Sequence, residues 1–217
     1  MMFINIPFHF INMVNPMIVK DLMVADPITI SSTSSIRKAI ELMKNNSIRH
    51  LPVVIKGNML KGFITLADLK QGLLPSMLTD VTLSDLMIKD PLTVHPEDDI
   101  EIAAHLIYEY KIGGMPVVKD GKVVGIITES DILRAFIDMM GMITESSRID
   151  VVIGDEPGKL RKAIQVIHDN NGEILSIGLS PSKSSKKIYY IRLSPVKTMD
   201  IKKALEKEKF RVVATRD

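Results

Sequence analysis

Residues 19–30 have the sequence VKDLMVADPITI and residues 83–94 have the sequence LSDLMIKDPLTV, with six identities at an offset of 64 positions. A similarity that covers both apolar and special positions indicates an internal repeat. The register continues in further pairs: IRHLPVV (48–54) with IGGMPVV (112–118) and, after a slip of one residue, GFITLADL (62–69) with GIITESDI (125–132).

Each repeat has the hydrophobic pattern of one β-α-β-β-α unit. The first predicted element is a short strand, at residues 28–30 and at residues 92–94. A helix follows each strand, because apolar residues recur at the spacing of one helical face. These residues are Ile36, Ala39, Ile40 and Met43 in the first repeat and Ile100, Ala103, Ala104 and Ile107 in the second.

A β-hairpin and a second helix complete each predicted unit. The hairpin turns contain Lys56-Gly57-Asn58 and Asp120-Gly121-Lys122, and the predicted strands are 51–55, 60–65, 115–119 and 123–128. The second helix begins near Ala67 and near Ser130. One unit of this size buries little apolar area by itself, so we expect the two to pack as a pseudo-symmetric pair.

The composition of the 217-residue chain narrows the classes of function. Its net charge is +2, and its Lys and Arg residues are scattered along the sequence. Because nucleic-acid binding needs a concentrated basic face, we do not expect a nucleic acid as the main partner. The absence of cysteine excludes disulfides and thiolate chemistry and is compatible with the cytoplasm, where we expect the protein to be.

The apolar residues 1–16 form neither a typical signal peptide nor a membrane span. The first cationic residue is Lys20, and polar residues and prolines interrupt the segment. We interpret it as an irregular N-terminal tail and expect no membrane partner.

The succession D-P-h-T-h, h-P-V-V and G-h-h-T-x-x-D-h, where h is an apolar residue, resembles the cystathionine-β-synthase (CBS) domain. The resemblance covers residues 17–79 and 80–140. It implies a pair of repeats, a Bateman module, that binds an adenine nucleotide or a related adenosyl compound and regulates a partner protein.

After a polar linker at residues 141–148, the pattern of residues 149–217 predicts the order βαββαβ, which is the ferredoxin-like arrangement. Its signature h-x-h-x-h-x-D-x-P-G-x-L resembles the ACT domain, a sensor of small molecules. The predicted fold class of the whole chain is therefore α/β (α+β), a tandem CBS pair followed by a ferredoxin-like ACT domain.

The signature positions are filled by Asp155, Pro157, Gly158 and Leu160. By resemblance this loop faces an effector at a dimer interface, although many ACT domains only pair. The residues also have a plain structural interpretation, in which Asp155 caps a helix, Pro157 lies in its first turn and Gly158 permits close packing.

The Thr-x-x-Asp motif, at Thr65–Asp68 and Thr128–Asp131, has two interpretations that remain compatible. In the first it is a capping box, which satisfies amides at the start of a helix. In the second it binds a ligand, because free amides at a helix start suit a phosphate and a carboxylate can accept the hydroxyls of a ribose.

The CBS resemblance implies roles for these residues. Asp68 and Asp131 would accept the ribose hydroxyls, and Thr65 and Thr128 would contact a phosphate or ribose oxygen. The base would lie against the chain around Thr29 and Thr93 and the strands at Leu51-Pro52 and Met115-Pro116.

The two repeats differ just before h-P-V-V, where the first has Arg49-His50 and the second has Gly113-Gly114. Arg49 or His50 could neutralise a phosphate, whereas glycines offer only room. We therefore predict unequal affinities for the two clefts. In the alternative, Arg49 is a solvated loop residue and His50 a half-buried, hydrogen-bonding one.

The sequence gives little support for catalysis. It contains no pair of histidines at a metal-binding spacing, no P-loop, no G-x-S-x-G motif and no G-x-G-x-x-G motif. We expect a homodimeric regulatory protein without a catalytic cofactor. Its candidate ligands are AMP, ADP, ATP, NAD and S-adenosylmethionine.

The order of two CBS repeats and one ACT domain is similar to that of acetoin utilisation proteins. The resemblance implies contact with an unidentified protein in acetoin or acetyl-coenzyme A metabolism. The alternative is a scaffold that binds no ligand and only dimerises and docks a partner.

Overall fold

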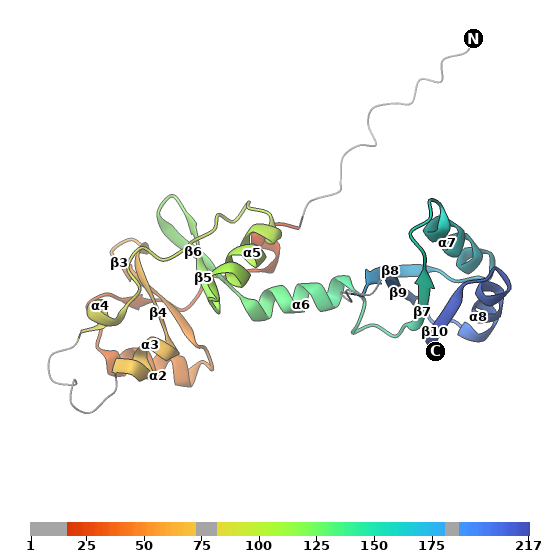
Figure 1. The fold of residues 1–217 in the computed structure, drawn as a ribbon. Coiled ribbons are helices and arrows are strands. Elements are labelled where there is room, and N and C mark those ends of the chain that lie inside the picture. Colours follow the sequence, from red (N-terminus) through yellow and green to blue (C-terminus); the bar gives the residue numbers. More distant parts are fainter. Residues whose placement is uncertain (1–16, 73–81, 181–186) are drawn as a thin grey trace, which may run out of the picture. The chain divides into compact units, whose positions relative to one another are not determined.

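The computed structural model describes residues 17–72, 82–180 and 187–217. The chain divides into two compact units, one up to Ile132 and one from Leu133 onward, each described here by itself (Figure 1). The division falls within helix α6 (Glu129–Met139). Within the described residues, no helix is both long enough and apolar enough to cross a membrane.

The first unit contains the two predicted repeats. The elements of the first repeat are β2 (Ile30–Ser31), α2 (Ile36–Asn45), β3 (His50–Ile55), β4 (Met59–Thr65) and α3 (Leu66–Gly72). Those of the second repeat are α5 (Ile100–Tyr110), β5 (Gly114–Lys119), β6 (Lys122–Thr128) and α6. The predicted strand at 92–94 is wrong, since only Val94 forms an isolated parallel bridge, with Val117. The two predicted repeats and the mixed α/β fold are confirmed.

The hairpin turns have the backbone conformation that their glycines predict. Gly57 and Gly121 have φ values of 80° and 75°, a region that costs glycine little. Strand β3 pairs with β4 and β5 with β6, both antiparallel and each with one register irregularity. The sequence pattern therefore specifies the centre of each repeat correctly.

Three short elements at the starts of the two repeats were not predicted: α1 (Val19–Leu22), β1 (Val24–Ala25) and α4 (Leu83–Leu86). Strand β1 pairs with β6 of the second repeat, and Val19 is fully buried in the core of that repeat. In the same way, Leu83 and Met87 are buried in the core of the first repeat. Each repeat thus contributes its leading D-L-M segment to the other.

Two glycines make this exchange possible. A Cβ atom on Gly62 would lie 2.6 Å from the sulfur of Met87 and 2.9 Å from the carbonyl oxygen of Ile88. At the equivalent place in the second repeat, a Cβ on Gly125 would collide with the side chain of Met23. The methionine of the opposite D-L-M segment therefore packs against the glycine of the G-h-h-T-x-x-D motif.

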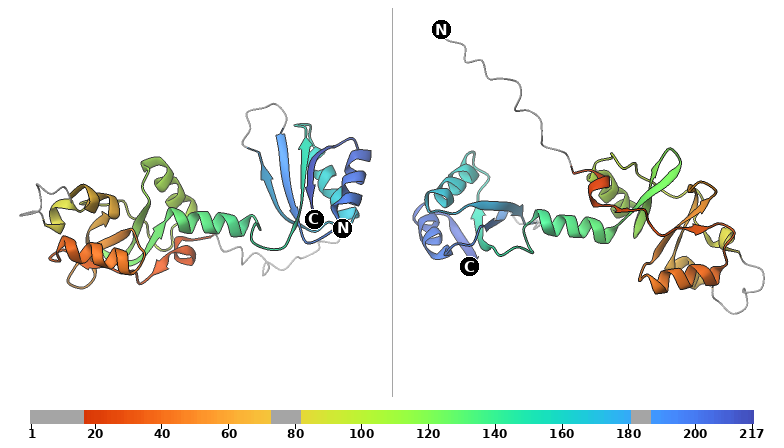
Figure 2. Two further views of the ribbon diagram at one scale, coloured as in Figure 1. Left: turned by 90° about the horizontal axis from the view of Figure 1, so that it is seen from below. Right: turned by 180° about the vertical axis from the view of Figure 1, so that it is seen from behind.

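The second unit has the predicted element order βαββαβ. Its elements are β7 (Ser147–Ile153), α7 (Lys159–Asp169), β8 (Ile174–Leu179), β9 (Lys187–Leu193), α8 (Thr198–Lys207) and β10 (Arg211–Arg216). The strands form an antiparallel sheet in the order β10-β7-β9-β8. Both helices cover the same face of this sheet (Figure 2), and the core lies between them and residues such as Ile149, Val151 and Ile191.

The loop before α7 differs from its structural interpretation. Asp155 does not cap the helix, because α7 begins at Lys159 and its N-cap position is Gly158. The Asp155 carboxylate pairs instead with Lys187 at 2.6 Å. Pro157 precedes the helix, which begins at Lys159, and Gly158 has a φ of 85° with open space around its Cβ position. Gly158 is needed for its backbone conformation and not for close packing. Leu160 is partly buried against the core of the unit.

Candidate functional site

Two clefts of the first unit each contain the Thr-x-x-Asp motif of one repeat. The larger has a volume of about 690 Å³ and is lined by Thr65 and Asp68. The smaller has a volume of about 280 Å³ and is lined by Thr128 and Asp131. Ligand pockets typically have about 300–1,000 Å³, so the larger cleft falls inside this range and the smaller just below it.

Each cleft is built from both repeats. In the larger cleft, the motif of the first repeat faces residues 90–92 and 110–114 of the second. In the smaller cleft, the motif of the second repeat faces residues 27–28 and 47–50 of the first. A ligand in either cleft would therefore touch both halves of the pseudo-symmetric pair.

The two motifs have nearly the same hydrogen-bond geometry. Asp68 Oδ2 accepts hydrogen bonds from the backbone N–H of Thr65 at 2.8 Å and from its hydroxyl at 2.7 Å. Asp131 Oδ2 accepts the corresponding bonds from Thr128 at 2.8 and 2.6 Å. Within the described residues, Oδ1 of either aspartate accepts no hydrogen bond, so one oxygen of each half-buried carboxylate remains open to a ligand.

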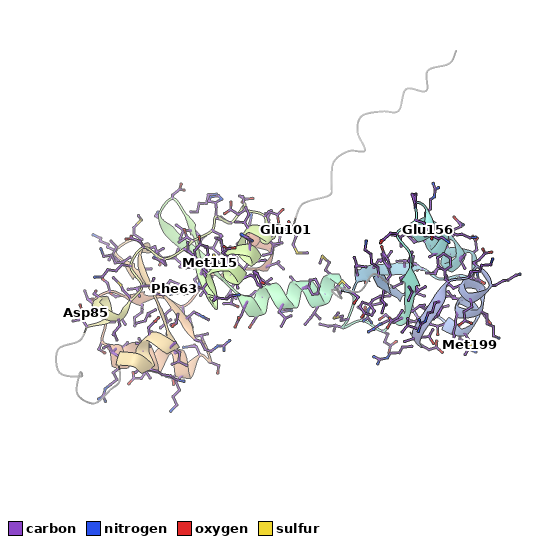
Figure 3. The ribbon with its side chains drawn as sticks, viewed as in Figure 1. Phe63, Asp85, Glu101, Met115, Glu156 and Met199 are labelled. Atoms are coloured by element: carbon purple, nitrogen blue, oxygen red, sulfur yellow. The ribbon has the colours of Figure 1, made fainter. Side chains whose placement is uncertain are left out.

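The same box also occurs at a place that neither cleft includes. Asp85 Oδ2 accepts hydrogen bonds from the N–H and hydroxyl of Thr82, at 2.9 and 2.6 Å, at the start of α4 (Figure 3). The Thr82 hydroxyl and N–H hold the pKa of the Asp85 carboxyl below its usual value. The box alone is therefore a helix cap, and its position in a cleft is what suggests a ligand.

His50 lines both clefts. Its ring stacks on Phe63, with the ring centroids 5.8 Å apart and the planes inclined by 12°. A Cβ atom on Gly113 would lie 2.8 Å from His50 Nε2, so the ring occupies the space that this glycine leaves. Burial lowers the pKa of His50, Arg49 lowers it further, and Glu129 and Asp68 act in the opposite direction.

The clefts differ in the charges that line them. Arg49 lines both, but the larger cleft also has two lysines, Lys70 and Lys111. Lys111 has a left-handed backbone with a φ of 55°, and its ammonium group lies 4.3 Å from the centre of the Tyr108 ring. The carboxylates that line the larger cleft are Asp68, Asp90 and Glu129, whereas Asp131 is the acidic lining residue of the smaller.

Several residues predicted to line the base lie outside the two clefts. Thr29 and Thr93 line neither cleft, although the residues just before them do. Leu51 and Met115 are fully buried in the two cores, because their strands point inward at these positions. The strands contribute their first residues to the clefts instead, at His50 and Gly114.

Sequence reasoning missed Phe63, Lys70, Asp90, Lys111 and Glu129, which all line the larger cleft. Phe63 and Lys70 flank the Thr-x-x-Asp motif, and Asp90 belongs to the repeated D-P dipeptide, so the repeat itself was a usable signal for these three. In the described part of the chain, no three His, Asp or Glu residues are arranged to hold a metal ion.

A family model described as CBS domain matches residues 19–74 and 83–138, just over half of the chain. Among curated relatives, a homoserine O-acetyltransferase of Methanocorpusculum labreanum is 39% identical over 114 residues, which are 52% of this chain and 23% of that protein. An L-aspartate semialdehyde sulfurtransferase of Methanocaldococcus jannaschii is 35% identical over 120 residues, 55% of this chain and 23% of that protein. The chain thus covers about a quarter of the length of these relatives.

Solved structures match the same part of the chain. The CBS domain pair of protein MJ0100, in complex with 5′-methylthioadenosine and S-adenosyl-L-methionine, is 34% identical with a TM-score of 0.52, covering 56% of this chain and 96% of that one. The protein CBSX2 in complex with AMP is 30% identical with a TM-score of 0.50, covering 56% and 97%. A Vibrio cholerae protein assigned to acetoin utilization (AcuB) is 31% identical with a TM-score of 0.53, covering 58% and 95%.

Proposed function

The chain belongs to the CBS domain family, and we propose that it is a regulatory protein that binds adenosyl compounds in the two clefts of its first unit. The observation that carries this proposal is the open carboxylate oxygen of Asp68 in one cleft and of Asp131 in the other. A carboxylate in this position can accept both hydroxyls of a ribose, while the threonine beside it holds the carboxylate in place.

The ligands of similar structures support the chemical class. The MJ0100 pair was crystallised with two adenosyl compounds and CBSX2 with AMP. An adenine ring would find the stacked rings of His50 and Phe63 in the wall of the larger cleft. Stacking on an aromatic side chain contributes about 1–3 kcal/mol per base in complexes with nucleic acids.

We assign different ligands to the two clefts. The larger cleft is large enough for a nucleotide, and its lysines Lys70 and Lys111 can bind a phosphate group. Within the described part of the chain, the smaller has Arg49 as its one arginine or lysine and suits an adenosyl compound without phosphate, such as 5′-methylthioadenosine. The sequence predicts that the two clefts bind with unequal affinities. The assignment adds that their ligands differ in chemical class.

The second unit fits an ACT domain, and its order βαββαβ supports that assignment. In this proposal the protein is a cytoplasmic homodimer, and the loop with Asp155, Pro157, Gly158 and Leu160 meets an effector or a second copy. Ligand in the clefts would change the packing of the two repeats, and the linker would transmit this change to a partner protein. Such coupling between sites is typically about 1–3 kcal/mol.

The similarity to the Vibrio cholerae protein supports a partner in acetoin or acetyl-coenzyme A metabolism. The proposed role is regulatory and not catalytic, and it includes no resident cofactor.

A thermal-shift screen with AMP, ADP, ATP, NAD and S-adenosylmethionine tests the proposal. A ligand at a hundred times its Kd stabilises the folded protein by about 2.7 kcal/mol, so the melting temperature should rise. The double variant D68A/D131A should lose this rise. The matched control is D85A, which removes the same helix cap outside the clefts and should keep it.

A scaffold that binds no ligand is the second candidate. The Thr82–Asp85 box favours it, because that box has the same geometry outside both clefts. The absence of any shift with all five compounds would support the scaffold and overturn the sensor.

A further inference from the structure

Three arginines lie side by side on the sheet of the second unit. In the strand register, Arg148 of β7 is directly opposite Arg216 of β10 on one side and Arg192 of β9 on the other. Directly opposite residues on neighbouring strands point to the same face of a sheet. Helices α7 and α8 cover the other face, so the arginine row lies on the side that they leave open (Figure 2).

The row carries more positive charge than its surroundings neutralise. Arg148 pairs with Asp150, its neighbour on the same face. Within the described residues, Arg192 and Arg216 form no ion pair, and Arg192 donates one hydrogen bond to the Ser146 hydroxyl at 2.8 Å. Two positive charges are therefore left without a negative partner, although like charges in opposite positions destabilise a sheet.

The central guanidinium is held in a fixed orientation. Arg148 Nε and Nη2 donate hydrogen bonds to the two oxygens of Asp150, at 2.6 and 2.7 Å. The Asp150 side chain is only 9% exposed, and the guanidinium also lies 4.8 Å from the centre of the Tyr190 ring. The Arg148 side chain is still 37% exposed, so the guanidinium hydrogens that do not bond to Asp150 can reach a ligand.

A hollow of about 110 Å³ adjoins this guanidinium, lined by Arg148, Asp150, Ala214, Thr215 and Arg216. This space has room for the head group of a ligand and not for a whole nucleotide. The hollow combines the positive charge of Arg216 with the Arg148–Asp150 ion pair, and Arg192 lies outside the hollow, further along the row.

We propose that this row is an anion site that binds the phosphate group of a small metabolite. A phosphate monoester carries nearly two negative charges at neutral pH, and the row offers the unneutralised guanidinium groups of Arg216 at the hollow and of Arg192 beyond Arg148. Guanidinium forks bind phosphate oxygens in pairs, and their planar donors suit this geometry better than lysines do. The rest of the ligand would extend from the hollow along the open sheet face. The site is independent of the clefts and of their ligands.

The test is a titration of the full chain with inorganic pyrophosphate at constant ionic strength, followed by amide chemical shifts. The expected result is saturable shifts in β7, β9 and β10. The double variant R192Q/R216Q should bind at least about tenfold more weakly, because hydrogen bonds to charged groups contribute about 1.5–3 kcal/mol each. The control K203Q/K207Q removes the same charge from α8, on the covered side of the sheet, and should bind like the wild type.

A second pair of substitutions separates fork geometry from charge. R192K/R216K keeps the charge and should still bind more weakly than the wild type, whereas equal affinity would contradict recognition by guanidinium forks. Equal losses in R192Q/R216Q and K203Q/K207Q, or shifts confined to the cleft residues, would overturn the site. The melting temperature of each variant without ligand shows whether it is folded.

Discussion

The two clefts share one scaffold and differ in chemistry. Both have a Thr-x-x-Asp box with hydrogen bonds of nearly equal length, and both are lined in part by residues of the opposite repeat. Among the described residues, the larger has Lys70 and Lys111 in its wall and the smaller has no lysine. The two clefts thus share the aspartate carboxylate of the motif and differ in the charges around it.

The difference between the repeats is also a matter of packing. At the position of His50 the second repeat has Gly114, where a Cβ atom would lie 2.8 Å from the carbonyl oxygen of Ile127. Its neighbour Gly113 leaves the space that His50 occupies. Gly113 therefore makes room for His50 of the other repeat, whereas Gly114 is required by residues 127 and 128 of its own repeat.

The largest expected effect concerns the exchanged segments. G62A should lower the free energy of unfolding by about 1–3 kcal/mol, because the added methyl meets both Met87 and the Ile88 backbone. G125A should cost less, because the methyl meets only the Met23 side chain, which can move. Denaturation of both variants with guanidinium measures the difference, and equal losses would contradict the packing described here.

Next in size is the effect of charge in the larger cleft. K70Q/K111N should weaken AMP binding about tenfold, because a charge-assisted hydrogen bond contributes about 1.5–3 kcal/mol. Asparagine is chosen at residue 111 because it tolerates the left-handed backbone. Binding of 5′-methylthioadenosine should not change.

Calorimetric titration measures both affinities. The matched control for K70Q/K111N is K38Q/K44Q, which removes two lysines from α2, outside both clefts. A similar loss of AMP binding in the control would mean that net charge, and not the cleft lysines, is responsible.

The smallest expected effect is the pH dependence that His50 imposes. Its pKa in the folded protein is lowered, first by burial and then by Arg49, so the unfolded chain binds the proton more readily. As the pH falls below the unfolded value of about 6.5, the free energy of unfolding should therefore decrease. H50Q should flatten this dependence between pH 7 and the folded pKa, and denaturation at several pH values measures it. A profile unchanged in H50Q, or flattened equally in the exposed-residue control H105Q, would contradict this role.

Much of the first unit could be predicted because its signals are local. Apolar periodicity located α2 and α5, and the Gly57 and Gly121 turns located the hairpins. The exchanged segments could not be found in this way. Helices α1 and α4 have only four residues each, too few to show a period, and their partners lie in the opposite repeat.

The candidate site was predicted in part for the same reason. Thr65, Asp68, Thr128 and Asp131 lie in clefts because their motif ends a strand, which the sequence displays. Thr29 and Thr93 were assigned by analogy, and the direction of their side chains depends on packing between the repeats. The assignment of Asp155 as a cap failed because α7 begins only at Lys159, with Gly158 at the cap position.

The central claim is that each aspartate holds the ribose of a different ligand. Calorimetric titration of D68A and D131A with AMP and with 5′-methylthioadenosine tests it most directly. We predict that D68A loses AMP binding and retains 5′-methylthioadenosine, and that D131A shows the reverse. Two variants that bind both compounds as the wild type does would contradict the account.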